Sequence, residues 1–340
     1  MKKILAAILI IIGGLLIFFL AGPRPEFEKP IQTISPLAVS IEELESYIEK
    51  KESGVEDLKP DNEARIIWAD SVRKTPYSMV YLHGFSASQR EGDPVHRTIA
   101  EMFGMNLYLS RIAGHGINSE ESFVELTPEA MVKSAREAIA IGNIIGEKVI
   151  VMSCSTGGTY SIYLATQNPD MIDALIMYSP NLKLYDPTVD LVTGPWGRFI
   201  AETVGGKYRI IEESIGTEKE KYNTTTYRIE GIIALQALLE QTMIDNIFRQ
   251  VKQPTFIGYY YKNEEEMDKV ISVDRIREYV KITGTPDNKL EVVEFEHAGT
   301  HVVPSGLDSK DIESVIEETR NYMINTLKID PVTSEKKMGI

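Results

Sequence analysis

The stretch that decides the fold is Lys148-Val149-Ile150-Val151-Met152-Ser153-Cys154-Ser155-Thr156-Gly157-Gly158, and residues 159–165 after it have the pattern of a helix. A strand, a small-x-Ser-x-small turn and a helix in this order are the layout of a nucleophile elbow. Such a turn strains the backbone of its serine and presses together the residues two positions away on each side, so both must be small. Ser153 and Gly157 meet that requirement.

The residues of this turn are expected to have different roles. The turn lifts the hydroxyl of Ser155 above the sheet edge and sets the Thr156 amide at a helix N-terminus, where it can stabilise an oxyanion. We interpret Cys154, the only cysteine, as a side chain packed beneath the turn, because Ser155 takes the exposed place. The bare motif recurs by chance, so a base, an acid and a second oxyanion donor are needed elsewhere in the chain.

Strand-like runs alternate with helical patterns along the chain. Apolar, β-branched runs occur at 64–69, 78–83, 105–110, 148–152, 173–178, 254–261 and 290–295, and helices are expected over 41–51, 127–146 and 311–328. This alternation predicts an α/β fold, with a mostly parallel sheet flanked by helices on both faces.

One segment interrupts the alternation. Seventy-five residues without a clear strand separate the runs at 173–178 and 254–261, although a crossover needs only about a dozen. We interpret 181–253 as an inserted cap, or lid, whose helical pattern at 230–250 is a core helix that returns the chain to the sheet. The core is then formed by 61–180 and 254–330, and 331–340 is a tail.

The N-terminus carries the second strong signal. Lys2 and Lys3 precede an uncharged apolar run from Ile4 to Gly22, whose nineteen residues can just cross a bilayer as a helix. Residues 1–22 are therefore a signal anchor or a cleaved signal peptide. The lysines should stay in the cytoplasm, so the rest is exported, membrane-anchored by this helix or secreted if it is cleaved. Residues 23–60 are expected to form a tether and a first helix.

The composition excludes some partners. The chain has 340 residues and a formal net charge of -14, which disfavours nucleic acid or an anionic membrane as an electrostatic partner. A single cysteine allows no internal disulfide, so an exported domain must depend on its core for stability. No metal or organic cofactor is implied.

The second oxyanion donor and the base are expected in turns that follow strands. In His83-Gly84-Phe85 the Phe85 amide can point into the cleft, and we interpret His83 as structural. His297 and His301 both follow the last strand, where an imidazole can reach Ser155. We favour His301, because it lies past the Gly299 turn and before an apolar pair.

The acid is expected after the strand at 254–261. Glu264, Glu265, Glu266 and Asp268 compete there, and we favour Asp268 because it begins an apolar turn that can bury it. The glutamates are interpreted as a solvated cluster. The resulting order Ser155, Asp268, His301 agrees with one of the known triad layouts and not with the other two.

With these residues assigned, the chain resembles the α/β-hydrolase superfamily, and more closely its monoacylglycerol-lipase or carboxylesterase-like branch. The matching pieces are 83–85, 111–116, 153–158, 267–270 and 298–301, and the likeness covers about 64–328. Two features depart from the family pattern: Ser153 stands where glycine is usual, and the acid loop at 261–268 is longer than typical.

The resemblance implies an α/β-hydrolase fold and a serine hydrolase of small-molecule acyl esters that works through an acyl-enzyme intermediate. Ser155 would be the nucleophile, His301 the base and Asp268 the orienting acid, with the amides of Phe85 and Thr156 as oxyanion donors. The cap would cover the acyl pocket. Two alternatives remain: an amide or peptide hydrolase with the same triad, and a catalytically inactive hydrolase fold that serves as a binding module.

Overall fold

The computed structural model describes residues 2–332, which are built around a seven-stranded sheet with the order β1-β3-β2-β4-β5-β8-β9. The strands are β1 (Arg65–Ile67), β2 (Thr75–Leu82), β3 (Asn106–Leu109), β4 (Gly146–Cys154), β5 (Ala174–Tyr178), β8 (Thr255–Tyr259) and β9 (Leu290–Glu294). β1 is antiparallel to β3, and all other neighbours are parallel. The predicted mostly parallel sheet is confirmed, with strand ends that differ by at most three residues from the predicted runs.

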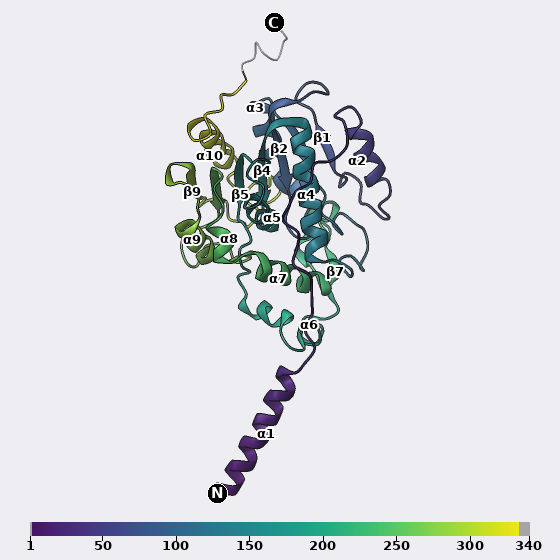
Figure 1. Cartoon of the computed structure of the whole chain (residues 1–340), viewed down its shortest axis with the longest axis vertical. Coiled ribbons are helices and arrows are strands. Elements are labelled where there is room, and N and C mark those ends of the chain that lie inside the picture. Colours follow the sequence, from purple (N-terminus) through teal and green to yellow (C-terminus); the bar gives the residue numbers. More distant parts are fainter. Residues whose placement is uncertain (1, 333–340) are drawn as a thin grey trace.

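Helices cover both faces of this sheet (Figure 1). They include α3 (Val95–Met102), α4 (Pro128–Ile145), α5 (Thr156–Ala165), α9 (Val273–Ile282) and α10 (Ile312–Asn325). Side chains of β2 alternate between the two layers: Val80 packs in the cluster that contains α4 and α5, and Tyr81 packs in the one that contains α3 and α10. α4 covers the helix predicted over 127–146, and Thr127 caps it: the Thr127 hydroxyl accepts the Ala130 N–H at 3.1 Å. The sheet is therefore buried on both faces, as parallel sheets usually are.

The segment between β5 and β8 contains the cap and the return helix. Its elements are η2 (Pro187–Thr193), α6 (Gly197–Gly205), β6 (Tyr208–Ile210), η3 (Glu212–Ser214), η4 (Glu218–Lys221), β7 (Thr226–Arg228), α7 (Glu230–Thr242) and α8 (Asp245–Phe248). β6 and β7 form an antiparallel hairpin that we did not predict, because each has only three residues, one of them an arginine, and lies in no apolar run that marks a core strand. The helical pattern is also divided: α7 ends at Thr242 and α8 follows as a separate turn. Most buried apolar side chains of α7 pack in the main core, whereas Val192 and Ala201 of the cap form a small separate cluster with Ile229 and Ile233.

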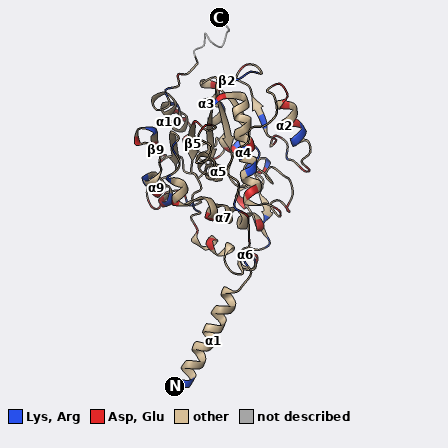
Figure 2. Ribbon diagram, viewed as in Figure 1, with Lys and Arg blue, Asp and Glu red and all other residues tan. Residues whose placement is uncertain are grey.

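The N-terminal residues form an apolar helix and a segment that packs on the body. α1 (Lys2–Leu20) has a mean hydropathy of 2.8, no buried residue and enough length to cross a bilayer. It leaves the body beside α6, and the charges on it lie only at its N-terminal end (Figure 2).

The segment expected as a tether contacts the domain directly. The Tyr163 hydroxyl donates to the Pro30 carbonyl at 2.6 Å, and the Ile34 N–H donates to Asn168 Oδ1 at 2.8 Å. The first helix follows as α2 (Leu44–Glu52). Of the expected tail, 333–340 lie outside the described residues.

Candidate active site

Ser155 lies at the junction of β4 and α5 in a strained backbone conformation. Its φ of 52° and ψ of -121° lie where residues other than glycine are rare. Surrounding hydrogen bonds hold it there: its N–H donates to the Tyr178 carbonyl, and its carbonyl accepts from the N–H groups of Gly158 and Asn181, each at 2.9 Å. The strain predicted from the small-x-Ser-x-small pattern is thus present at this serine.

Close backbone contacts explain the glycines near Ser155. A Cβ on Gly157 would lie 2.0 Å from the Leu82 carbonyl oxygen, and one on Gly84 would lie 2.9 Å from the Ser155 Cβ. Neither position has room for a side chain. Ser153, which departs from the usual glycine, is buried. Cys154 is also buried, and burial raises the pKa of its thiol well above the usual range, so it packs beneath the turn as we expected.

Two backbone N–H groups next to Ser155 are unpaired. Within residues 2–332, the N–H groups of Phe85 and Thr156 donate to no acceptor, and both residues line the cavity that Ser155 lines. Gly84 is in contact range of Ser155, which sets the Phe85 turn beside the serine. Unpaired amides beside a serine in one cavity can stabilise an oxyanion.

His301 and Asp268 form a close pair at the same sheet edge. His301 Nδ1 and Asp268 Oδ2 are 2.6 Å apart, and Asp268 Oδ1 accepts the N–H groups of Val270 and Ile271 at 2.9 and 3.3 Å. Asp268 is buried, whereas His301 lines the cavity. His301 Nε2 is buried and has no hydrogen-bond partner among the described residues, so this nitrogen is available to a group in the cavity.

The pair shifts both pKa values in the direction that favours the ion pair. Burial disfavours the charged form of each group, but their mutual charge and hydrogen bond outweigh it. The pKa of Asp268 is therefore lowered, and the pKa of His301 is raised above 6.5.

The competing residues lie apart from this pair. His297 is exposed, and so are Glu264, Glu265 and Glu266, of which Glu266 is paired with Lys262 at 2.6 Å.

His83 is buried and fully hydrogen-bonded. Its Nε2 accepts the Ile112 N–H at 3.0 Å, and its Nδ1 donates to the Gly84 carbonyl at 2.8 Å. This histidine fixes the turn, in agreement with the structural role we inferred for it.

Glu91 is a candidate residue that the sequence reasoning missed. Its Oε2 accepts the Gly84 N–H at 2.8 Å and the Tyr81 hydroxyl at 3.1 Å, and it lines the cavity together with Ser155 and His301. Burial raises the pKa of Glu91 to about 7, against the Gly84 N–H and the charge of His301, which lower it. In the sequence Glu91 is a lone glutamate outside any motif, and the structure places it in a 3-10 turn, η1 (Gln89–Gly92).

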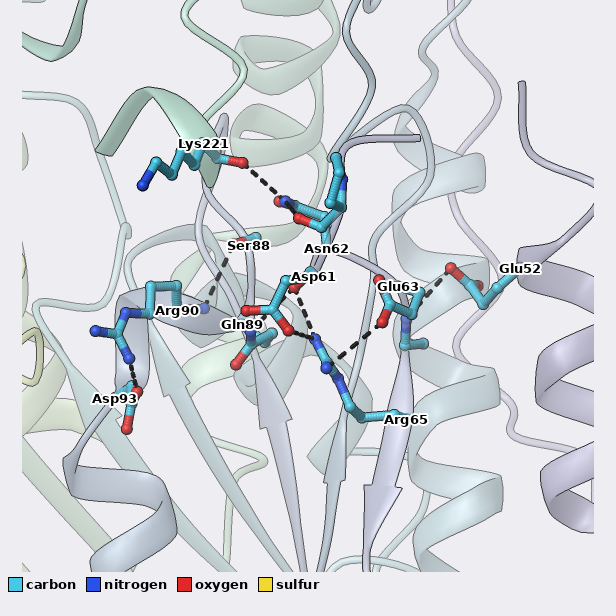
Figure 3. Close-up of polar contacts among 12 residues, drawn as sticks. Glu52, Asp61, Asn62, Glu63, Arg65, Ser88, Gln89, Arg90, Asp93 and Lys221 are labelled. Carbon is cyan, nitrogen blue, oxygen red and sulfur yellow. Dashed lines mark hydrogen bonds and ion pairs between the residues drawn. The ribbon is translucent and has the colours of Figure 1, made fainter. Parts of the chain in front are cut away.

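Polar contacts hold the turn that carries Glu91 (Figure 3). Gln89 Nε2 donates to the Asp61 carbonyl at 3.2 Å, the Arg90 N–H donates to Ser88 Oγ at 3.4 Å, and Arg90 pairs with Asp93. Glu91 is thus held on a braced segment and in turn braces the turn of the candidate oxyanion donor Phe85.

The cavity above Ser155 has a volume of about 630 Å³ and two unlike parts. The part under the cap is mainly apolar, with Leu184, Val192, Ile211, Ile229 and Leu235 among its lining residues, although Arg209 and Glu213 of the cap also line the cavity. The part near η1 and η4 carries Arg90, Glu91, Lys219 and Asp308. Residues 2–332 contain no group of three His, Cys, Asp or Glu side chains that could hold a metal ion.

No protein-family model matches the chain, and no curated protein matches it in sequence. Solved structures do match. A structure of the metagenome-derived lipolytic enzymes LipS and LipT has a TM-score of 0.63 at 14% identity, covering 78% of this chain and 98% of that one. The Paleococcus ferrophilus monoacylglycerol lipase has a TM-score of 0.54 at 13% identity, covering 77% and 97%. Est1E from Butyrivibrio proteoclasticus with bound ferulic acid has a TM-score of 0.50 at 16% identity, covering 78% and 95%.

These similarities concern architecture. The chain has the α/β-hydrolase fold, as the resemblance of its motifs implied.

Proposed function

We propose that the chain is a serine hydrolase of carboxylic acyl esters. Ser155 attacks the ester carbonyl while His301 takes its proton, and Asp268 holds the imidazole and stabilises its charged form. The oxyanion rests on the amides of Phe85 and Thr156. The alcohol leaves with the proton from His301, and water activated by the same histidine then releases the acid from the acyl-enzyme.

One observation carries this proposal: Ser155, with its strained backbone, and His301, which is paired with Asp268, line the same cavity. The Nε2 atom of His301 has no hydrogen-bond partner within the described residues. Two solved structures with the same fold are described as lipolytic enzymes and as a monoacylglycerol lipase, and these descriptions support an ester as the substrate. The apolar part of the cavity fits an acyl chain, because apolar surface removed from water there contributes to binding.

The test combines labelling with turnover. A fluorophosphonate probe should label the wild-type chain and leave Ser155→Ala unlabelled. Rates on acyl esters of rising chain length are then compared with rates on aminoacyl amides. Faster turnover of amides would support a peptidase instead, and equal labelling of wild type and variant would overturn the serine mechanism.

We also propose that α1 anchors an exported enzyme in the membrane. None of its nineteen residues is buried, and all of them except Lys2 and Lys3 are uncharged and apolar. The two lysines lie at the end expected to stay in the cytoplasm. The mass of the protein extracted from membranes tests this. An intact chain that resists alkaline extraction supports the anchor, whereas a chain that begins near Pro23 in the soluble fraction means a cleaved signal.

A further inference from the structure

The end of α1 is seated on the cap. The Trp196 N–H donates to the Pro23 carbonyl at 2.7 Å, and the Trp196 indole lies over Gly22, where a Cβ would be 2.1 Å from its nitrogen. The rings of Phe18 and Trp196 are 5.3 Å apart. Trp196 immediately precedes α6, and tryptophan is enriched where membrane helices reach the water interface. A bilayer that holds α1 therefore has its surface beside α6.

The same part of the cap exposes large apolar side chains. Leu191 is 53% exposed, Phe199 65% and Val204 84%, and we name these three residues the cap rim. They belong to η2 and α6, at the end of the body from which α1 leaves (Figure 1). η2 and α6 pack against each other, so these exposed side chains belong to adjoining elements, and apolar surface gathered in this way can serve as an interaction site.

The net charge of the cap segment is more compatible with a lipid surface than the net charge of the rest of the chain. Residues 181–253 contain nine Lys and Arg against ten Asp and Glu, although the whole chain has a net charge of -14. The cap is thus nearly neutral and is not strongly repelled by anionic lipids, whereas the rest of the domain is.

The cavity reaches the rim. Leu191 and Val204 are each more than half exposed to solvent and also line the cavity that contains Ser155 and His301. Cavity-lining residues that are this exposed lie at an opening of the cavity. The opening therefore lies on the same side of the domain as α1.

We propose that the cap rim lies on the surface of the bilayer that α1 enters, and that the cavity opens toward the lipid there. An apolar ester passes from the membrane to Ser155 without crossing water. The docking rests on the proposed anchor, and the substrate route rests on the proposed ester hydrolysis.

The docking is tested with single fluorescent labels on the full chain in phosphatidylcholine vesicles. A polarity-sensitive label is placed on Phe199→Cys or Val204→Cys, and on Val72→Cys as a control. Val72 is 47% exposed and precedes β2, at the sheet edge opposite the cap. Cys154 is buried, so it should not react.

Lipids that carry a nitroxide near the headgroup then act as the quencher. We expect quenching of the rim labels to exceed that of the Val72 label severalfold, with a blue-shifted emission. Equal quenching at the rim and at Val72 would overturn the docking.

The substrate route is tested with Phe199→Glu, which lies on the rim but does not line the cavity around Ser155, and with Val72→Glu as its control. Because a Phe side chain moved from water into lipid gains about 1.5–3 kcal/mol, the rim variant should hydrolyse a vesicle-borne long-chain ester roughly tenfold more slowly. It should hydrolyse a short soluble ester at the wild-type rate.

The outcomes separate the two proposals. Equal loss on both esters, or no loss on the vesicle-borne ester, would overturn the lipid route. A wild type that cleaves neither ester would defeat the proposed function, and the quenching result would still decide the docking.

Discussion

The sheet edge and the cap are built on different principles. At the sheet edge Ser155, Asp268 and the Phe85 turn are fixed by buried backbone hydrogen bonds and by contacts that leave no room for a Cβ. The cap has a small four-residue buried cluster that it shares with Ile233 of α7, and it exposes apolar side chains to solvent. The contrast fits the proposed function, in which the sheet edge would hold the reacting groups in fixed positions and the cap would offer an apolar surface to the substrate.

Among substitutions at the sheet edge, we expect the loss of the proposed base, His301, to reduce activity the most. Replacing His301 with Ala should lower kcat by about 10⁶-fold, because a triad serine without its base loses the function of the whole unit. His297→Ala is the matched control and should keep its activity, since this side chain is exposed. Steady-state ester kinetics decide between them, and inactivity of the His297 variant alone would reverse our assignment.

The acid comes next. Asp268→Asn keeps the shape of the side chain but removes the charge that orients His301, so kcat should fall by about 10⁴-fold. Glu264→Gln, Glu265→Gln and Glu266→Gln serve as controls, because all three carboxylates are exposed. If one of these three variants showed the large loss instead, the acid would lie in the glutamate cluster.

The free energy of unfolding should depend strongly on the return helix α7 and only weakly on the exposed residues of the cap. Leu238 of α7 is buried in the main core, so Leu238→Ala should lower the free energy of unfolding by about 2–5 kcal/mol. Val204→Ala, on an exposed cap position, should change it by less than about 0.5 kcal/mol. Denaturant unfolding in detergent measures both, and similar values for the two variants would mean that cap and core unfold as one packed unit.

Glu91 gives the smallest but most specific effect. Glu91→Gln preserves an acceptor for the Gly84 N–H but weakens it, so kcat should fall about threefold to tenfold while KM changes little. Loss of kcat at constant KM distinguishes positioning of the oxyanion turn from a change in substrate binding.

The pH dependence of kcat/KM should shift in a definite direction in the Glu91→Gln variant. His301 acts as a base only when neutral, so kcat/KM rises with pH through its pKa, which Asp268, Glu91 and Asp308 raise above 6.5. Removing the Glu91 charge lowers that pKa, and the rising limb should move to lower pH. A limb that stays in place would mean that the Glu91 charge does not act on His301. Glu264→Gln is the control carboxylate.

Much of the fold was readable from the sequence because its signals are local. Seven strands, the α4 cap at Thr127 and the Ser155 turn follow from apolar runs, capping chemistry and the need for small residues. The β6–β7 hairpin could not be predicted, because its two short strands lie in no apolar run of the sequence. Glu91 was missed because its importance arises from long-range contacts with Tyr81 and Gly84, and not from any motif.

The sequence alone determined the order of elements and the residue types of the candidate site. Periodicity, turn chemistry and the Ser155, Asp268, His301 order depend on neighbours along the chain, so they survive without coordinates. Only the tertiary structure decided which of the alternative acids lies beside His301. It brings Asp268 and not Glu264 to His301, sets Glu91 beneath the Phe85 turn, and joins α1 to the cap through Trp196. Burial and charge pairing act across space between distant segments, and they appear only when the chain has folded.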